Sequence, residues 1–186
     1  GIVVAPTNTT MKGADVTFIL GVWYTPGDFD WADQVAACAI KDYNIDPRRI
    51  YATGCSAGGL ASGVMAFQRS NYLAASAPNS GGIAVPGQDM LQDAKRMTPT
   101  MTMHGAPGQD VVIVDFAETS QTLYTSGKAK GGFMVNCNHG QGHCRAPEAL
   151  QVAAWQFMKD HPYGVSPEPY ANGLPASFPQ YCQIMK

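Results

Sequence analysis

The run GCSAG at residues 54–58 has the residue types and spacing of a nucleophilic serine on a tight turn. An apolar segment predicted as a strand, residues 49–53, precedes it, and a helix of small residues follows from about Leu60. Such a turn holds its serine in a strained backbone conformation with the hydroxyl exposed, so we predict Ser56 as a nucleophile. The backbone amide of Ala57, at the start of the helix, is predicted to face a developing oxyanion. Side chains are expected to collide with neighbouring backbone at three glycines of this turn: Gly54, Gly58 and Gly59.

A serine hydroxyl needs an adjacent base, which a third group must orient. The chain has four histidines. His143 lies just before the last predicted helix, where a hydrolase of this type carries its base, and His139 in the same loop remains the alternative. We expect His104 to shape the turn that follows its strand, and His161, at the end of the last helix, to lie at the surface.

The acid is expected in the loop after the fourth predicted strand. Asp110 lies in that loop, whereas Asp115 falls inside the helix predicted over residues 111–126 and would point along it. Asp110 could instead serve only as the N-cap of that helix. The chain order Ser56, Asp110, His143 is the order found in α/β-hydrolases.

The elements around these residues alternate between short apolar strands and helices. This alternation predicts a single α/β domain over residues 1–186, with a mostly parallel sheet covered by helices on both faces and a site at the carboxyl ends of the strands. Beyond residue 161, proline and glycine predict a tail (162–186) that wraps the surface without forming an element. Trp155 and Phe157 are expected in the core. The predicted strands are 2–5, 49–53, 73–77, 100–104 and 132–136, and the main helices are 31–43, the one from 60, 111–126 and 147–159.

Composition narrows the classes of function. The 186 residues carry a net charge of −2 without a basic cluster, which argues against nucleic acid as a partner. No apolar run approaches the ~18 residues of a membrane span, so no membrane partner is expected. Five cysteines favour an oxidising compartment, secreted or periplasmic, and their odd number leaves one without a partner inside the chain.

The turn at residues 54–58, together with the sequence DPRRIY at residues 46–51 before it, resembles the polyhydroxybutyrate depolymerase and feruloyl esterase group of secreted α/β-hydrolases. His104-Gly105, Gly142-His143 and the closing segment 155–162 fit the same group, and the resemblance covers about residues 1–162. It implies the α/β-hydrolase fold and hydrolysis of an aromatic ester or a polyester segment, with Ser56 as nucleophile, His143 as base and Asp110 as acid, and without a cofactor or metal. The loop from His104 to Asp110 is longer than the corresponding turn in the resembled family, so Asp115 remains an alternative for the acid.

Cysteine directly before the serine and directly after the histidine is similar to the Cys-Ser, Asp, His-Cys arrangement of tannases and fungal-type feruloyl esterases. That resemblance implies a disulfide between Cys55 and Cys144. Neighbours of a hydrogen-bonded serine and histidine can lie within the ~4.4–6.8 Å Cα separation that a disulfide requires. Among the other cysteines, a Cys38–Cys182 pair is favoured over pairs with Cys137.

In the resembled family, a strand and a His-Gly loop with a second oxyanion donor precede the segment similar to residues 1–6. We therefore expect an N-terminally incomplete domain, and a separate N-terminal piece of the same fold is an expected partner. Pocket walls are expected from Trp23 and Tyr24, from residues 78–80 and from 137–142.

Two other hypotheses of function remain open from the sequence. One is a hydrolase-fold binding domain with weak or no activity. The other is a zinc site, because two cysteines and two histidines fall within residues 137–144, and these ligand types suit zinc. Its candidate ligands are Cys137, His139, His143 and Cys144.

Overall fold

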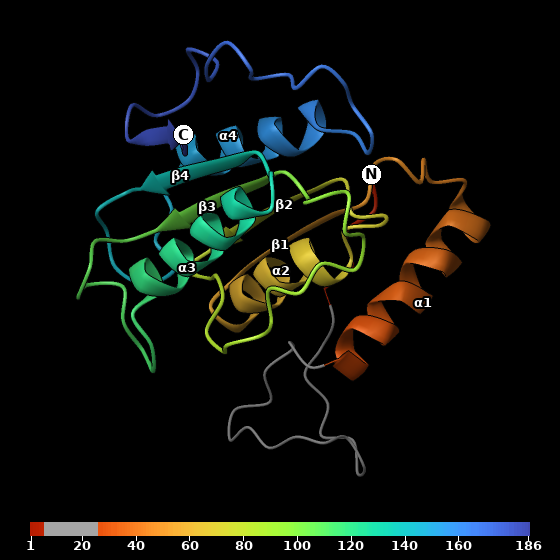
Figure 1. Ribbon diagram of the computed structural model, residues 1–186, viewed down its shortest axis with the longest axis horizontal. Helices are drawn as coiled ribbons and strands as arrows, with labels where there is room; N and C mark the ends of the chain where they lie inside the picture. Colours follow the sequence, from red (N-terminus) through yellow and green to blue (C-terminus); the bar gives the residue numbers. More distant parts are fainter. Residues whose placement is uncertain (6–25) are drawn as a thin grey trace.

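The computed structural model describes residues 1–5 and 26–186, and this part of the chain forms one five-stranded sheet with four helices (Figure 1). The strands follow the order β1-β2-β3-β4-β5 across the sheet; β1 to β4 are parallel, and β5 is antiparallel to β4. The helices are α1 (Pro26–Tyr43), α2 (Ala57–Gln68), α3 (Phe116–Ala129) and α4 (Glu148–Asp160). The strands are β1 (Tyr51–Cys55), β2 (Ala75–Asn79), β3 (Thr100–His104), β4 (Met134–Asn138) and β5 (Cys182–Ile184).

Apolar side chains on the two faces of the sheet form two separate clusters. On one face, Met101 and Val135 pack with Phe157 of α4. On the other, Met134 packs with Phe67 of α2 and with α3, and α2 and α3 overlie the sheet in Figure 1. The predicted mostly parallel sheet with helices on both faces is thus confirmed. In the described ranges, no helix is long and apolar enough to cross a membrane.

The strand boundaries place the chemistry-bearing residues at one edge of the sheet. β3 matches its predicted range, whereas β1, β2 and β4 each begin and end two residues later than predicted. The register pairs Cys55 at the end of β1 with Asn79 at the end of β2, and His104 at the end of β3 with Asn138 at the end of β4. The strand predicted over residues 2–5 is wrong, because these residues are exposed and form no ladder.

The C-terminal segment is part of the sheet and the core, so its predicted role as a surface wrap without an element is wrong. β5 pairs with β4, and a Cys137–Cys182 disulfide joins the two strands at a Cα separation of 4.1 Å. Tyr170 and Phe178 are buried in the cluster beneath α4. The favoured Cys38–Cys182 pair is also wrong, since Cys38 is a free, exposed cysteine on α1.

The end of α4 departs from prediction because the same segment folds back over it. His161, expected at the surface, is completely buried; its Nδ1 lies 2.6 Å from the Phe157 carbonyl and its Nε2 lies 2.7 Å from Oε1 of Glu168. Phe157 is fully buried as expected, but Trp155 is 51% exposed and not part of the core.

The neighbouring aromatic residues of α4 provide a matched test of this packing. Phe157→Ala leaves a cavity in the core and is expected to lower the free energy of unfolding by about 3–5 kcal/mol. Trp155→Ala should cost less than about 1 kcal/mol, because its ring is largely in water. Urea unfolding followed by far-ultraviolet circular dichroism measures both, and equal losses would contradict the assigned faces of α4.

Candidate active site

The predicted nucleophile lies on a sharp turn between β1 and α2. Ser56 has φ 58° and ψ −121°, a conformation that a non-glycine residue adopts only under constraint from its surroundings. Its backbone N–H donates to the Asn79 carbonyl at 3.2 Å, which fastens the turn to the end of β2. Ala57 begins α2, and the first amides of a helix have no acceptor inside the helix. The turn therefore places the partly buried Ser56 directly before a helix amide that has no acceptor within the helix.

Two of the three glycines at the turn have the predicted steric role. A Cβ on Gly54 would lie 2.7 Å from the Gly58 carbonyl carbon, and one on Gly59 would lie 2.9 Å from Cα of Gly81. A Cβ on Gly58 would meet no atom within 4 Å, so the collision predicted there is wrong.

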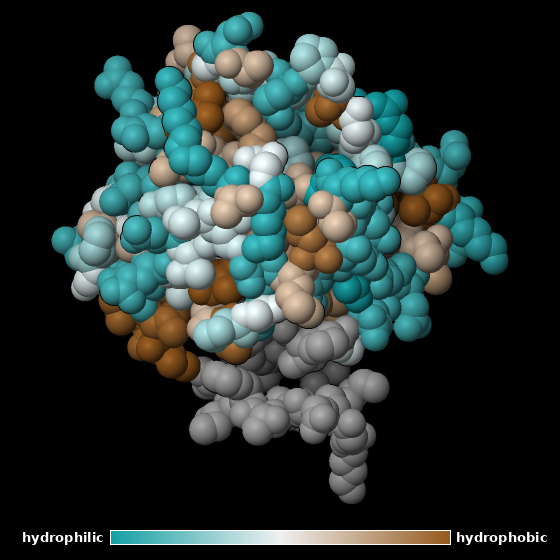
Figure 2. All heavy atoms as spheres, in the orientation of Figure 1, coloured by the Kyte–Doolittle hydropathy of each residue, from teal (hydrophilic) through white to brown (hydrophobic). Residues whose placement is uncertain are grey.

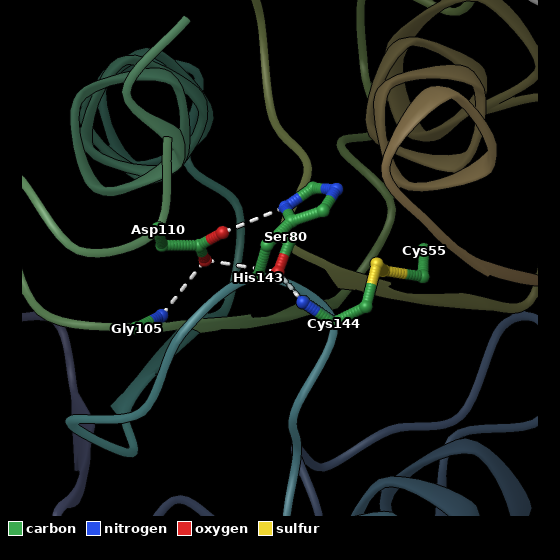
Figure 3. The surroundings of a disulfide bond; sticks show 6 residues. All are labelled: Cys55, Ser80, Gly105, Asp110, His143 and Cys144. Carbon is green, nitrogen blue, oxygen red and sulfur yellow. Dashed lines mark hydrogen bonds and ion pairs between the residues drawn. A yellow bond between two sulfur atoms is a disulfide. The ribbon is translucent and has the colours of Figure 1, made fainter. Parts of the chain in front are cut away.

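A buried carboxylate orients the predicted base. His143 Nδ1 lies 2.8 Å from Oδ1 of Asp110, and Figure 3 shows the other ring nitrogen directed away from the carboxylate. Oδ2 of Asp110 accepts hydrogen bonds from the Gly105 amide and from the Ser80 hydroxyl, both at 2.9 Å. Asp110 has no solvent exposure, whereas the His143 side chain is 24% exposed. The pair can thus hold a proton-accepting nitrogen at the surface with its charge partner beneath.

Asp115, the alternative acid, has a structural role. Its Oδ1 accepts from the Ala117 amide at 2.9 Å as the N-cap of α3, and its Oδ2 accepts from the Gly108 amide at 2.7 Å. The helix therefore begins at Phe116, later than predicted. Asp110 is not the N-cap, because both of its oxygens are engaged at the site.

The other two histidines near the strand ends do not pair with the acid. His139 is buried, and its Nδ1 accepts from the Gln141 amide at 3.2 Å. Burial lowers the pKa of His139, an effect that Asp110 opposes and that His104 reinforces. His104 Nδ1 lies 2.7 Å from the Gly105 carbonyl, in keeping with its expected role in the turn after β3.

The disulfide implied by the tannase-like arrangement is present. Cys55 and Cys144 are bonded at a Cα separation of 5.8 Å, and one ring nitrogen of His143 lies within 4.8 Å of both sulfur atoms. The bond brings the residues next to each cysteine, Ser56 and His143, to the same side of the sheet edge. Within residues 26–186, no hydrogen bond joins Ser56 Oγ to the imidazole in this state.

Both cysteines of the predicted zinc site are in disulfides, so the site would lack thiolate ligands. Cys137 is bonded to Cys182 and Cys144 to Cys55, so neither offers a free sulfur. His143 is engaged with the Asp110 carboxylate.

Two contacts of the site were not predicted from the sequence, which placed Ser80 only among the expected pocket-wall residues 78–80. The buried Phe116 ring packs on the His143 ring at a centroid distance of 4.7 Å, and Ser80 contacts the acid directly. The only sequence signal for Ser80 was its place after a strand end. Because it is fully buried, it supports the site instead of forming a pocket wall. The expected wall residues Trp23 and Tyr24 lie outside the described residues.

Comparison with known proteins agrees with this architecture. The model of the prolyl oligopeptidase family matches residues 1–96. The bifunctional acetylxylan esterase/xylanase XynS20E of Neocallimastix patriciarum is 34% identical, over 85% of this chain and 28% of that protein. Poly(3-hydroxyalkanoate) depolymerase C of Paucimonas lemoignei is 29% identical, over 84% of this chain and 37% of its own length. The chain thus spans about a third of the length of these curated relatives.

Solved structures show the same fold at low sequence identity. The native form of a protein named pOPH superposes with a TM-score of 0.67 at 20% identity, covering 84% of this chain and 60% of that one. A carboxylesterase from Bacillus cereus has a TM-score of 0.54 at 15% identity, covering 72% of this chain and 60% of its own. The fold is that of the α/β-hydrolases, as the sequence predicted.

The cysteine pairing of the site can be checked directly. Alkylation of the unreduced protein followed by peptide mass mapping should modify Cys38 alone and recover two linked peptide pairs, Cys55–Cys144 and Cys137–Cys182. The exposed thiol reacts because it is accessible and unbonded. Alkylation of Cys55 or Cys144 without reductant, in folded protein, would contradict the bond across the site.

Proposed function

The chain belongs to the prolyl oligopeptidase family, and we propose that it carries the catalytic machinery of a serine esterase. The observation that supports this most directly is the pair of the buried Asp110 and the partly exposed His143, fastened by a disulfide beside the strained Ser56. A nucleophile, a base and an orienting acid converge at the carboxyl ends of parallel strands, where sites of such sheets lie. The two curated relatives named above are an acetylxylan esterase/xylanase and a polyester depolymerase, which favours esters as the substrates.

In the first half of the reaction, Ser56 Oγ attacks the carbonyl carbon of the ester, and its proton passes to Nε2 of His143. Asp110 accepts the Nδ1–H at 2.8 Å, which fixes the tautomer that leaves Nε2 free to accept. The carbonyl oxygen becomes an oxyanion near the amide of Ala57. Collapse of this intermediate breaks the bond to the alcohol, which leaves with the proton from Nε2, and an acyl-serine remains.

Water completes the cycle by the same route. His143 removes a proton from water, the resulting nucleophile attacks the acyl carbon, and Ser56 departs with the proton returned from the imidazole. The products are the carboxylic acid and the free enzyme. Because each step moves one proton through the same nitrogen, the orientation of the imidazole affects both halves of the reaction.

The substrate class proposed is an ester of an aromatic acid or a short polyester segment. A panel of four substrates distinguishes these classes: methyl ferulate, hydroxybutyrate oligomers, acetylated xylan and a prolyl p-nitroanilide. The anilide tests for the peptidase activity that the name of the family implies. We expect hydrolysis of at least one ester and none of the anilide. Two disulfides suit an oxidising environment, and we propose a secreted or periplasmic location on that ground.

A fluorophosphonate probe tests the nucleophile. The wild-type chain should be labelled stoichiometrically at Ser56, because the probe reacts with a serine activated by a neighbouring base. Ser56→Ala should abolish both labelling and ester hydrolysis while leaving the fold intact by circular dichroism. Absence of labelling in folded wild-type protein would instead favour a binding domain without activity.

The two aspartates provide a second, matched test. Asp110→Asn should lower kcat by about 10³–10⁴-fold, because the neutral amide no longer holds the base in the productive tautomer. Asp115→Asn should stay within about threefold of wild type, because asparagine also caps a helix well. Kinetics on a p-nitrophenyl ester measure both, and a larger loss from Asp115→Asn would identify that residue as the acid.

A further inference from the structure

The proposed esterase chemistry requires the acid and the base to keep one relative position, although they lie on loops that follow different strands. Asp110 follows β3, and His143 follows β4. Ser80, at the end of β2, contacts both loops through one atom. We propose that Ser80 is a positioning residue that fixes the Asp110–His143 pair, an inference that rests on the proposed function.

The hydroxyl of Ser80 joins the two loops by two hydrogen bonds. Oγ donates to Oδ2 of Asp110 at 2.9 Å and accepts from the backbone N–H of Cys144 at 2.9 Å. Figure 3 shows this chain of contacts, which runs from the carboxylate of Asp110 through the hydroxyl of Ser80 to Cys144 and its disulfide with Cys55. Cys144 directly follows the base, so the second bond fixes the backbone from which the imidazole extends.

A hydroxyl can make both contacts with a single atom. A carboxylate can only accept, and a backbone amide can only donate, so the atom between them must do both. Loss of this oxygen would leave the Cys144 N–H without its partner and would remove one of the three donors to a fully buried carboxylate. The loss is expected to cost most at the carboxylate, because Asp110 is fully buried and water cannot replace the missing donor there, whereas Cys144 is an exposed residue.

The backbone at Ser80 is held in place for this contact. Its φ is 41°, in the left-handed region that glycine adopts without strain, and its N–H donates to the Met103 carbonyl at 2.8 Å. A glycine at this position would relieve the strain but supply no hydroxyl. The two features can therefore be separated by mutation.

Ser80 is fully buried, so it cannot touch an ester in the site. Its loss should therefore act on the rate of the chemical step and not on substrate binding. Ser76 is a matched control: it lies on β2, the strand that Ser80 directly follows, is equally buried, and donates one hydrogen bond to the Ser62 carbonyl at 2.8 Å, away from the acid.

The test compares Ser80→Ala, Ser80→Gly and Ser76→Ala in the full chain. Both Ser80 variants should lower kcat by about 10-fold to 100-fold with KM within about twofold, as expected for loss of a hydrogen bond to a charged group. Ser76→Ala should keep kcat near wild type. A kcat retained in both Ser80 variants, a change in KM alone, or retention in Ser80→Gly but not in Ser80→Ala would overturn the proposal.

Proton NMR provides a readout that does not depend on turnover. The proton on Nδ1 of His143 that faces Asp110 should resonate far downfield in the wild type. In both Ser80 variants it should shift or broaden by exchange, and in Ser76→Ala it should not. If the wild-type protein neither reacts with the fluorophosphonate probe nor hydrolyses an ester, the esterase proposal fails, and this resonance then tests the role of Ser80 by itself. An unchanged resonance in both Ser80 variants would refute that role.

Discussion

The burial of the Asp110 carboxylate is the constraint on which the rest of the site depends. Removing a charge from water costs several kcal/mol unless hydrogen bonds and an opposite charge replace the solvent. Three donors do so here, from Ser80 at the end of β2, Gly105 at the end of β3 and His143 beyond β4. These donors reach one point only because the parallel strands end at the same edge, so the sheet register is a condition of the site.

Backbone strain gathers at the same edge. Ser56, Ser80 and Cys144 have φ of 58°, 41° and 59°, and such conformations cost about 1–3 kcal/mol each in residues other than glycine. Each is fixed by a contact that spans elements: Ser56 by the Asn79 carbonyl, Ser80 by two loops, and Cys144 by a disulfide. The apolar clusters on both faces make the sheet a rigid support for that strain.

The sequence predicted this site better than its surroundings, for a physical reason. A strained turn needs glycines at set positions, and a cysteine stands beside each of the predicted residues Ser56 and His143, so the turn and the Cys55–Cys144 bond left local signals. Contacts between segments far apart in the sequence leave no such signal. His161 was predicted at the surface but is buried beneath the C-terminal segment, and β5 forms by pairing with β4, which no local sequence pattern indicates. The contacts of Ser80 with Asp110 and Cys144 were not predicted either, since both partners lie on other loops and the sequence indicated only a pocket wall over residues 78–80.

The segment 137–144 shows how these constraints combine. Cys137 ties its beginning to β5, and Cys144 ties its end back across the sheet edge to β1. A segment bound covalently at both ends retains few conformations, so little ordering remains to be done when a substrate arrives. The two disulfides do not fix the direction of the backbone just after His143, the proposed base, and the hydroxyl of Ser80 accepts a hydrogen bond from the N–H at that point. The orientation of His143, the proposed base, thus depends on covalent restraint at the ends of the segment and on one partly buried hydrogen bond at the residue that follows it.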